Sequence, residues 1–106
     1  MSWPLLRGQV FRADIGLNEP KLFVVVSNKR RNNVLPQVLT VRLTTSPKPS
    51  LPSIVELGHP EAFVGYAVCD DIVEVYENEV IAVTGALSVR AMRAINAGLA
   101  AALALD

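Results

Sequence analysis

Hydrophobic and polar residues alternate along residues 37–44, and this is the clearest pattern in the chain. Alternate side chains of a β-strand point to opposite faces, so this segment is predicted to be a strand with one apolar face. The apolar face would carry Leu39, Val41 and Leu43. The opposite face would carry Thr40, Arg42 and Thr44.

Other short apolar runs predict further strands at residues 7–14, 22–26, 53–57, 64–69, 72–76 and 80–86. The run at 22–26 (LFVVV) contains no polar residue, so it is expected to be a central strand that is buried on both sides. The runs at 64–69 and 72–76 are expected to form either two strands or one bent strand. Loops between the strands are predicted where the sequence is polar or rich in proline, at 16–20, 27–33 and 45–52.

The last segment of the chain has the periodicity of a helix. Ser88 is a suitable N-cap, and the helix is predicted to continue to about Leu105. Gly98 and the alanines around it would allow this helix to approach another surface closely. Its apolar stripe would consist of Met92, Ile95, Leu99 and Leu103. Several short strands followed by one helix predict a mostly β (α+β) fold, a small barrel or strongly curled sheet with a C-terminal α-helix.

The composition is that of a folded protein in a reducing compartment. A chain of 106 residues is expected to form one domain, residues 1–106, and its hydrophobic content of 51% argues against disorder. Cys69 is the only cysteine, so an internal disulfide is excluded and a cytoplasmic location is favoured. No secretory signal is visible, and the apolar tail at 97–105 is too short to span a bilayer, so no membrane association is expected.

The formal net charge is zero, but the charges are divided between the two halves of the chain. Residues 1–53 contain eight of the ten basic residues and two acidic ones, whereas residues 54–106 contain two basic and eight acidic residues. This asymmetry suggests a basic face that would bind a polyanion. The alternative is that the two halves intermingle in space and their fields cancel.

Several kinds of active site are excluded by the residues present. The single histidine, His59, rules out a two-histidine ribonuclease mechanism, and its Gly-His-Pro context favours a role in a turn. No cysteine–histidine set has zinc spacing, and no glycine-rich phosphate loop occurs. Asp70 and Asp71 are neighbours, so in a strand they would point to opposite faces and would not hold one ion unless the strand breaks there, and no third carboxylate is placed to help them. No metal or other cofactor is therefore expected, and one of these aspartates should be a structural hydrogen-bond acceptor.

A set of cations and hydroxyls suits phosphoryl chemistry. Arg42 and Thr44 share one face of their strand, and Lys21 begins the strand that is expected to lie beside it. Cations and hydroxyl donors around a phosphate can support attack by an RNA 2′-OH without a metal. The set is completed by Thr45 and by the basic residues Lys29, Arg30 and Arg31. On spacing alone, an ordinary solvated strand face is the favoured alternative.

Five short segments carry a family resemblance. They are RGQVF at residues 7–11, KLFVVVS at 21–27, VRLTT at 41–45, VCDDI at 68–72 and GALS at 85–88, the last followed by a helix with a methionine. In this order and at these intervals they resemble the motifs of the MazF/PemK family of toxin endoribonucleases, the RNA-cleaving toxins of toxin–antitoxin systems. The resemblance extends over nearly the whole chain.

The resemblance implies an SH3-like barrel that forms a homodimer, with single-stranded RNA lying across the groove between the protomers. It implies an antitoxin partner that blocks this groove with an acidic segment. It also implies sequence-selective, metal-independent cleavage, in which the 2′-OH attacks the adjacent phosphate and leaves a 2′,3′-cyclic phosphate and a 5′-hydroxyl. The usual active-site pair of the family, an arginine and a threonine, falls on Lys21 and Thr44.

The chain departs from the family pattern at Lys21, where the family has an arginine, because lysine lacks the two-pronged hydrogen bonding of a guanidinium. Either Lys21 or Arg42 would then act as the acid or base, while Thr44 would stabilise the phosphate. The RNA itself would be held by Lys29, Arg30, Arg31, Thr45 and Asp70.

Two further departures bear on the substrate. Val68 stands where one branch of the family has an arginine before its Cys-Asp pair, so the role of that arginine is not carried over. The first loop of the family is shortened here to residues 16–20, which leaves the RNA class open among mRNA, tRNA and rRNA.

Two other classes of function stay open from the sequence. A non-enzymatic topoisomerase poison of the CcdB kind shares the fold, but its tryptophan-glycine-isoleucine end is absent, since the only tryptophan is Trp3. A catalytically inactive relative that binds only RNA or its antitoxin is compatible with the lysine at position 21.

Overall fold

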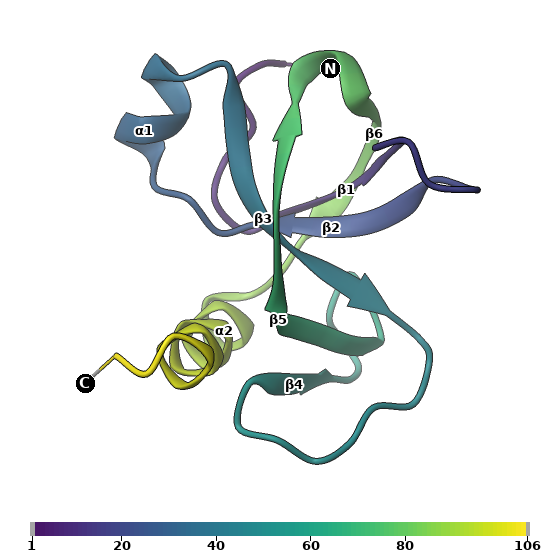
Figure 1. The fold of residues 1–106 in the computed structure, drawn as a ribbon, viewed down its shortest axis with the longest axis vertical. Coiled ribbons are helices and arrows are strands. Elements are labelled where there is room, and N and C mark those ends of the chain that lie inside the picture. Colours follow the sequence, from purple (N-terminus) through teal and green to yellow (C-terminus); the bar gives the residue numbers. More distant parts are fainter. Residues whose placement is uncertain (1, 106) are drawn as a thin grey trace.

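The computed structural model describes residues 2–105, and over these residues the chain forms one antiparallel sheet of six strands with two α-helices (Figure 1). The strands are β1 (Gln9–Ala13), β2 (Lys21–Val25), β3 (Gln37–Thr44), β4 (Ile54–Leu57), β5 (Gly65–Tyr76) and β6 (Val80–Ala86). The helices are α1 (Lys29–Val34) and α2 (Val89–Ala102), and a short 3-10 turn, η1 (Glu77–Glu79), precedes β6. No helix within residues 2–105 is long and apolar enough to cross a membrane.

The sheet has the strand order β4-β5-β3-β2-β1-β6, and its longest strand, β5, is bent (Figure 1). This strand of 12 residues pairs with β3 along its length, but the register shifts between Val41 and Arg42, where β5 bends. Only the first part of β5, up to Val68, also pairs with β4. The single bent strand was one of the two alternatives for residues 64–76, and the mostly β, barrel-like fold with a C-terminal helix is confirmed.

The two faces of the central strand β2 contribute to two separate cores. Val24 packs with Val41 beneath α2, whereas Phe23 and Val25 belong to a cluster on the other face with Phe11. Phe23, Val24 and Val25 are each fully buried, which confirms the prediction from the uninterrupted apolar run. The rings of Phe11 and Phe23 stack with centroids 5.8 Å apart, so cross-strand aromatic packing contributes to the second core.

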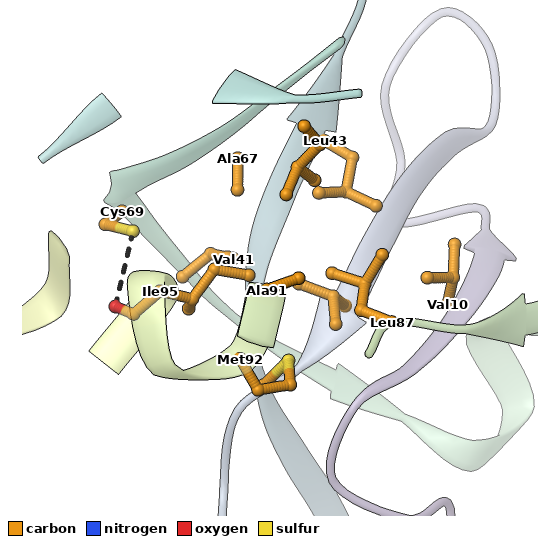
Figure 2. Packing of buried hydrophobic residues seen from close by; sticks show 11 residues of the cluster. Val10, Val41, Leu43, Ala67, Cys69, Leu87, Ala91, Met92 and Ile95 are labelled. Carbon is orange, nitrogen blue, oxygen red and sulfur yellow. Dashed lines mark hydrogen bonds between the residues drawn. The ribbon is translucent and has the colours of Figure 1, made fainter. Parts of the chain in front are cut away.

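The first core lies between α2 and the curved sheet (Figure 2). Ile95 is fully buried there, and the Cys69 thiol lies 3.8 Å from the Ile95 carbonyl oxygen, which accepts its weak hydrogen bond. Burial, with a smaller contribution from the Asp70 carboxylate, raises the pKa of Cys69 to about 11. Cys69 is therefore a core residue of low reactivity, and it is free of any disulfide.

Ser88 begins α2 as predicted. Its Oγ accepts a hydrogen bond from the Ala91 amide at 3.0 Å, and the Glu61 carboxylate accepts from both Oγ and the backbone N–H of Ser88, at 2.6 and 2.9 Å. The hydrogen bonds from the Ser88 hydroxyl and then from its amide lower the pKa of the Glu61 carboxyl below its ordinary value. The start of the helix is thus tied to the loop that follows β4.

The predicted end of this helix is wrong by three residues. The helix stops at Ala102, Leu103 is its C-cap, and Ala104 has a positive φ of 55°. Of the predicted stripe, Met92 and Ile95 are buried, but Leu103 is 53% exposed. Leu99 is partly buried against the first core, so the buried stripe ends with the helix, before Leu103.

The loop predicted at residues 27–33 is also wrong, because residues 29–34 form α1. Asn28 caps this helix by accepting from the Arg31 amide at 2.9 Å. Asn32 is almost fully buried, and its side-chain amide donates to the carbonyl oxygens of Leu5 and Ser27 at 3.3 and 3.1 Å. The asparagines that suggested a loop are a helix cap and a buried anchor.

Because α2 packs closely against the sheet at Gly98, adding one methyl group there should lower the stability of the protein. In the Gly98→Ala variant the new Cβ would lie 2.7 Å from Cys69 Sγ and 3.0 Å from Val55 Cγ2, so the helix must shift. We expect a loss of about 1–3 kcal/mol in the free energy of unfolding, measured by urea denaturation. Gly58→Ala is the matched control, because nothing lies within 4 Å of its added Cβ. Equal stability of both variants would contradict this packing.

The contact between Glu61 and Ser88 predicts a pH-dependent contribution to stability. A carboxyl whose pKa is lowered by folding stabilises the fold above its ordinary value of 4.5 and loses this effect as the pH falls through the lowered pKa. Glu61→Gln should therefore reduce the free energy of unfolding at pH 7 more than at pH 3, as measured by urea denaturation. Glu77→Gln, at an exposed position of η1, is the control. A loss of equal size at both pH values would count against the contact.

Candidate functional site

Lys21 and Thr44 lie opposite each other where β2 and β3 end. Leu22 pairs with Leu43, so the next residues outward on the two antiparallel strands, Lys21 and Thr44, share a cross-strand position and one face of the sheet. Both side chains are half-buried. The strand register thus puts a cation and a hydroxyl at neighbouring strand ends, as expected from the sequence, and their role in a site stays a prediction.

Arg42 lies on the same face, two residues further into β3. It pairs with the buried Phe23 on one side and with Val68 of β5 on the other. Its Nε is buried and has no hydrogen-bond partner within residues 2–105. A buried donor without a partner costs about 1–3 kcal/mol, so an acceptor brought by a ligand would relieve a real penalty here.

This strand face is less solvated than the alternation along β3 suggested. Thr40 was assigned to the polar face, yet it is fully buried, and its Oγ1 donates to the Val73 carbonyl oxygen at 2.9 Å. Arg42 and Thr44 are half-buried. With one of its three side chains fully buried and two half-buried, this face is not an ordinary solvated strand face.

The cross-strand position of Lys21 and Thr44 continues onto two further strands. Thr44 pairs with Tyr66 of β5, and Tyr66 pairs with Glu56 of β4. We call these four residues, Lys21, Thr44, Tyr66 and Glu56, the polar row. Tyr66 and Glu56 were not predicted from the sequence, because their place beside Thr44 depends on strand pairings that no local pattern encodes.

The ion pair between Lys21 and Glu19 is weak enough for an anionic ligand to replace it. Lys21 Nζ forms an ion pair of 3.1 Å with Glu19 Oε1, and the two side chains are 25% and 72% exposed. An ion pair this exposed contributes little to stability, so an anionic ligand can compete with Glu19 for Lys21.

Thr44 and Thr45 differ in their surroundings. Thr44 Oγ1 accepts a hydrogen bond from the Ser46 amide at 3.1 Å, which begins the proline-rich loop and leaves the hydroxyl hydrogen of Thr44 available to donate. Thr45 is exposed just beyond the end of β3. Thr44 is thus oriented by the backbone, whereas Thr45 lies at the open edge of the site.

Within one chain, the basic residues of α1 lie far from the polar row. Lys29 and Arg30 are exposed, and Arg31 Nη1 donates to the Gln37 carbonyl oxygen at 3.2 Å, at the start of β3. β3 has eight residues, so Gln37 and Thr44 are about 23 Å apart along the strand. Figure 1 shows α1 on the opposite side of the molecule from the end of β3.

Asp70 lies at the bend of β5. Its Oδ2 accepts a hydrogen bond from Ser53 Oγ at 2.7 Å, so the prediction that one aspartate is a structural acceptor is confirmed. The acidic half of the chain therefore reaches the site region through Glu56 and Asp70, and the two halves do intermingle here. No group of three or more His, Cys, Asp or Glu side chains among the described residues could hold a metal ion.

A family model described as the PemK-like, MazF-like toxin of type II toxin-antitoxin systems matches residues 6–103. The chain belongs to this family. Among PemK/MazF relatives, Endoribonuclease MazF4 of Mycobacterium tuberculosis (strain H37Rv) is 37% identical over 100 residues, which cover 94% of this chain and 93% of that protein. Endoribonuclease MazF1 of Mycobacterium bovis has the same identity and coverage.

Solved structures of PemK/MazF proteins share the fold. An endoribonuclease in complex with its cognate antitoxin from a mycobacterial species is 36% identical, with a TM-score of 0.90 and coverage of 96% of this chain and 97% of that chain. A MazE-MazF structure from Deinococcus radiodurans has a TM-score of 0.83 at 13% identity, covers 99% of this chain and 100% of that chain, and supports the fold alone.

Proposed function

We propose that the chain is an endoribonuclease toxin that cuts single-stranded RNA without a metal, with Lys21, Thr44 and Arg42 around the scissile phosphate. The observation that carries this proposal is the β2–β3 register, which puts a lysine, a threonine and an unpartnered arginine donor on one face. Family membership and the mycobacterial relatives named endoribonucleases support the activity.

The chemistry needs three things from the protein. The RNA 2′-OH attacks the adjacent phosphorus in line and loses its proton, while the leaving 5′-oxygen gains one. The products are a 2′,3′-cyclic phosphate and a 5′-hydroxyl. Lys21 or Arg42 transfers protons, and the other cation, with the Thr44 hydroxyl, stabilises the crowded phosphate. Arg42 Nε has a hydrogen bond to offer that the protein itself does not use.

The other predicted RNA-binding residues are assigned from where they lie relative to Thr44. Thr45 lies beside Thr44, and Asp70 lies at the bend of β5, so both would contact nucleotides near the cut. Lys29, Arg30 and Arg31 lie at the far end of β3, so they would bind the backbone of an RNA longer than the site itself, or one that extends from a second protomer.

Two protein partners are proposed, a second copy of the chain and an antitoxin, from the family and from the cations of the site. A homodimer with RNA in its groove, and a cognate antitoxin whose acidic segment competes with RNA for the cations, are the proposed assembly and its regulator. Support comes from the family description and from the mycobacterial relative solved with its cognate antitoxin. The free, buried Cys69 is compatible with action in the cytoplasm.

Mapping of cut RNA tests the proposed activity. Purified protein incubated in EDTA with total bacterial RNA should produce discrete cuts at a short motif, with 5′-hydroxyl ends, as read by sequencing of new 5′ ends. These ends would also identify mRNA, tRNA or rRNA as the substrate. An absence of cuts by folded, antitoxin-free protein would contradict the proposal and favour an inactive relative.

Substitutions at the site test the assigned residues. Lys21→Ala and Thr44→Ala should each reduce the cleavage rate by about 10²–10³, because each removes a group that acts on the reacting phosphate. Arg42→Ala should reduce it as well, and the rates are measured on one labelled oligonucleotide that contains the motif. Thr84→Ala on β6 is the control, since Thr84 lies outside the site. Cleavage that survives the triple Lys21→Ala, Thr44→Ala, Arg42→Ala change would show that the assignment is wrong.

The ion pair at Lys21 predicts a gain of affinity. Glu19→Gln frees Lys21 and removes a negative charge beside the bound polyanion, so RNA binding should become about two- to fivefold tighter. Fluorescence anisotropy with an uncleavable 2′-O-methyl oligonucleotide measures this, and the difference should diminish at high salt. Glu74→Gln is the control, because Glu74 is exposed on β5 and pairs with Leu39, five residues along β3 from Thr44. Unchanged or weaker binding by Glu19→Gln would refute this role of the ion pair.

A further inference from the structure

The geometry points to a recognition pocket for one RNA base at the Glu56 end of the polar row, selective for bases that carry an amino group at their pairing edge. This inference rests on the proposed function and deepens it, because it concerns the choice of sequence rather than the cleavage step. The pocket has a volume of about 270 Å³ and is lined by Glu56, Leu57, Gly58, Val64, Gly65 and Tyr66.

The pocket lies within reach of a nucleotide next to the scissile phosphate. Thr44 pairs with Tyr66 and Tyr66 pairs with Glu56, so the pocket begins one strand away from Thr44 and ends two strands away. Neighbouring strands are about 4.8 Å apart, which puts Glu56 about 10 Å from Thr44. A base splayed from a nucleotide that is held at Thr44 can therefore enter the pocket.

Gly65 explains why the pocket lies so close to the site. Its φ is +150°, and a Cβ built there would lie 2.5 Å from the Thr44 carbonyl oxygen and 2.8 Å from Phe63 Cε2. Only glycine permits β5 to begin this close to the end of β3. This contact fixes the place of the next residue, Tyr66, beside Thr44.

The lining suits a base rather than a phosphate. Tyr66 supplies an aromatic ring on which a base can stack, and Leu57 and Val64 supply apolar contacts. Glu56 is the one charged residue of the lining, and its carboxylate repels a phosphate. The RNA phosphates require cations, which Lys21 and Arg42 supply. The pocket at Glu56 is therefore suited to a different part of the RNA.

The Glu56 carboxylate sets the selectivity. An ionised carboxylate only accepts hydrogen bonds, so it favours the amino groups of guanine, adenine and cytosine. Uracil has no amino group; its pairing edge offers one donor, N3–H, between two carbonyl oxygens that the carboxylate repels. One position of the cleavage motif should therefore be depleted of uracil.

Cleavage of a randomised RNA pool tests the pocket. The wild-type protein should show one position beside the cut that is depleted of uracil, while Glu56→Gln, which can donate to uracil, should raise uracil at that position about fivefold or more and leave the other positions unchanged. Tyr66→Leu should raise the KM for the preferred motif about tenfold, whereas Tyr66→Phe, which keeps the ring, should behave as wild type.

The controls come from the far side of the sheet. Tyr76→Leu lies at the other end of β5 and Glu77→Gln on the adjoining η1, so neither should alter the base profile. Identical base profiles for the wild type and Glu56→Gln at every position would overturn the inference while leaving the proposed function intact. A wild-type protein that cuts no RNA at all would instead refute the proposed function, and this inference with it.

Discussion

The pairing of β2 with β3 is the constraint on which the site depends. The register Leu22–Leu43 and Val24–Val41 buries one set of side chains under α2 and places Lys21 opposite Thr44 on the other face. A slip of one residue would turn every side chain of β2 to the opposite face and separate the lysine from the threonine. The two apolar cores on either side of β2 therefore fix the geometry of the polar residues at its end.

The bend in β5 is the second determinant, because it brings the acidic half of the chain against the basic half. Its first part carries Tyr66 beside Thr44 and pairs with Glu56, and its later part continues along β3 toward α1. The site is consequently mixed in charge, with cations toward β2 and a carboxylate toward β4. RNA backbone and RNA base would meet different ends of one row, which allows cleavage and selectivity to be altered separately.

Much of the fold was predictable because it follows local periodicity. The alternation along β3, the apolar run of β2 and the Ser88 cap of α2 each determine an element directly from neighbouring residues, and all three appear in the structure. The failures depend on contacts that local periodicity does not encode. Asn32 is buried and donates to the carbonyl oxygen of distant Leu5, and Leu103 is exposed because the helix ends at Ala102. For the site, spacing alone favoured an ordinary strand face, and the family resemblance was needed to single out Lys21 and Thr44. Tyr66 and Glu56 depend on strand pairings between distant segments.

A crystal structure of the protein with a 2′-O-methyl RNA oligonucleotide, which binds but cannot be cleaved, would show where the reacting phosphate lies. One phosphate should lie within hydrogen-bonding distance of Lys21 Nζ and Thr44 Oγ1, with the Arg42 guanidinium contacting the same phosphate or its neighbour. RNA bound elsewhere, for example along α1 alone with the ends of β2 and β3 unoccupied, would contradict it.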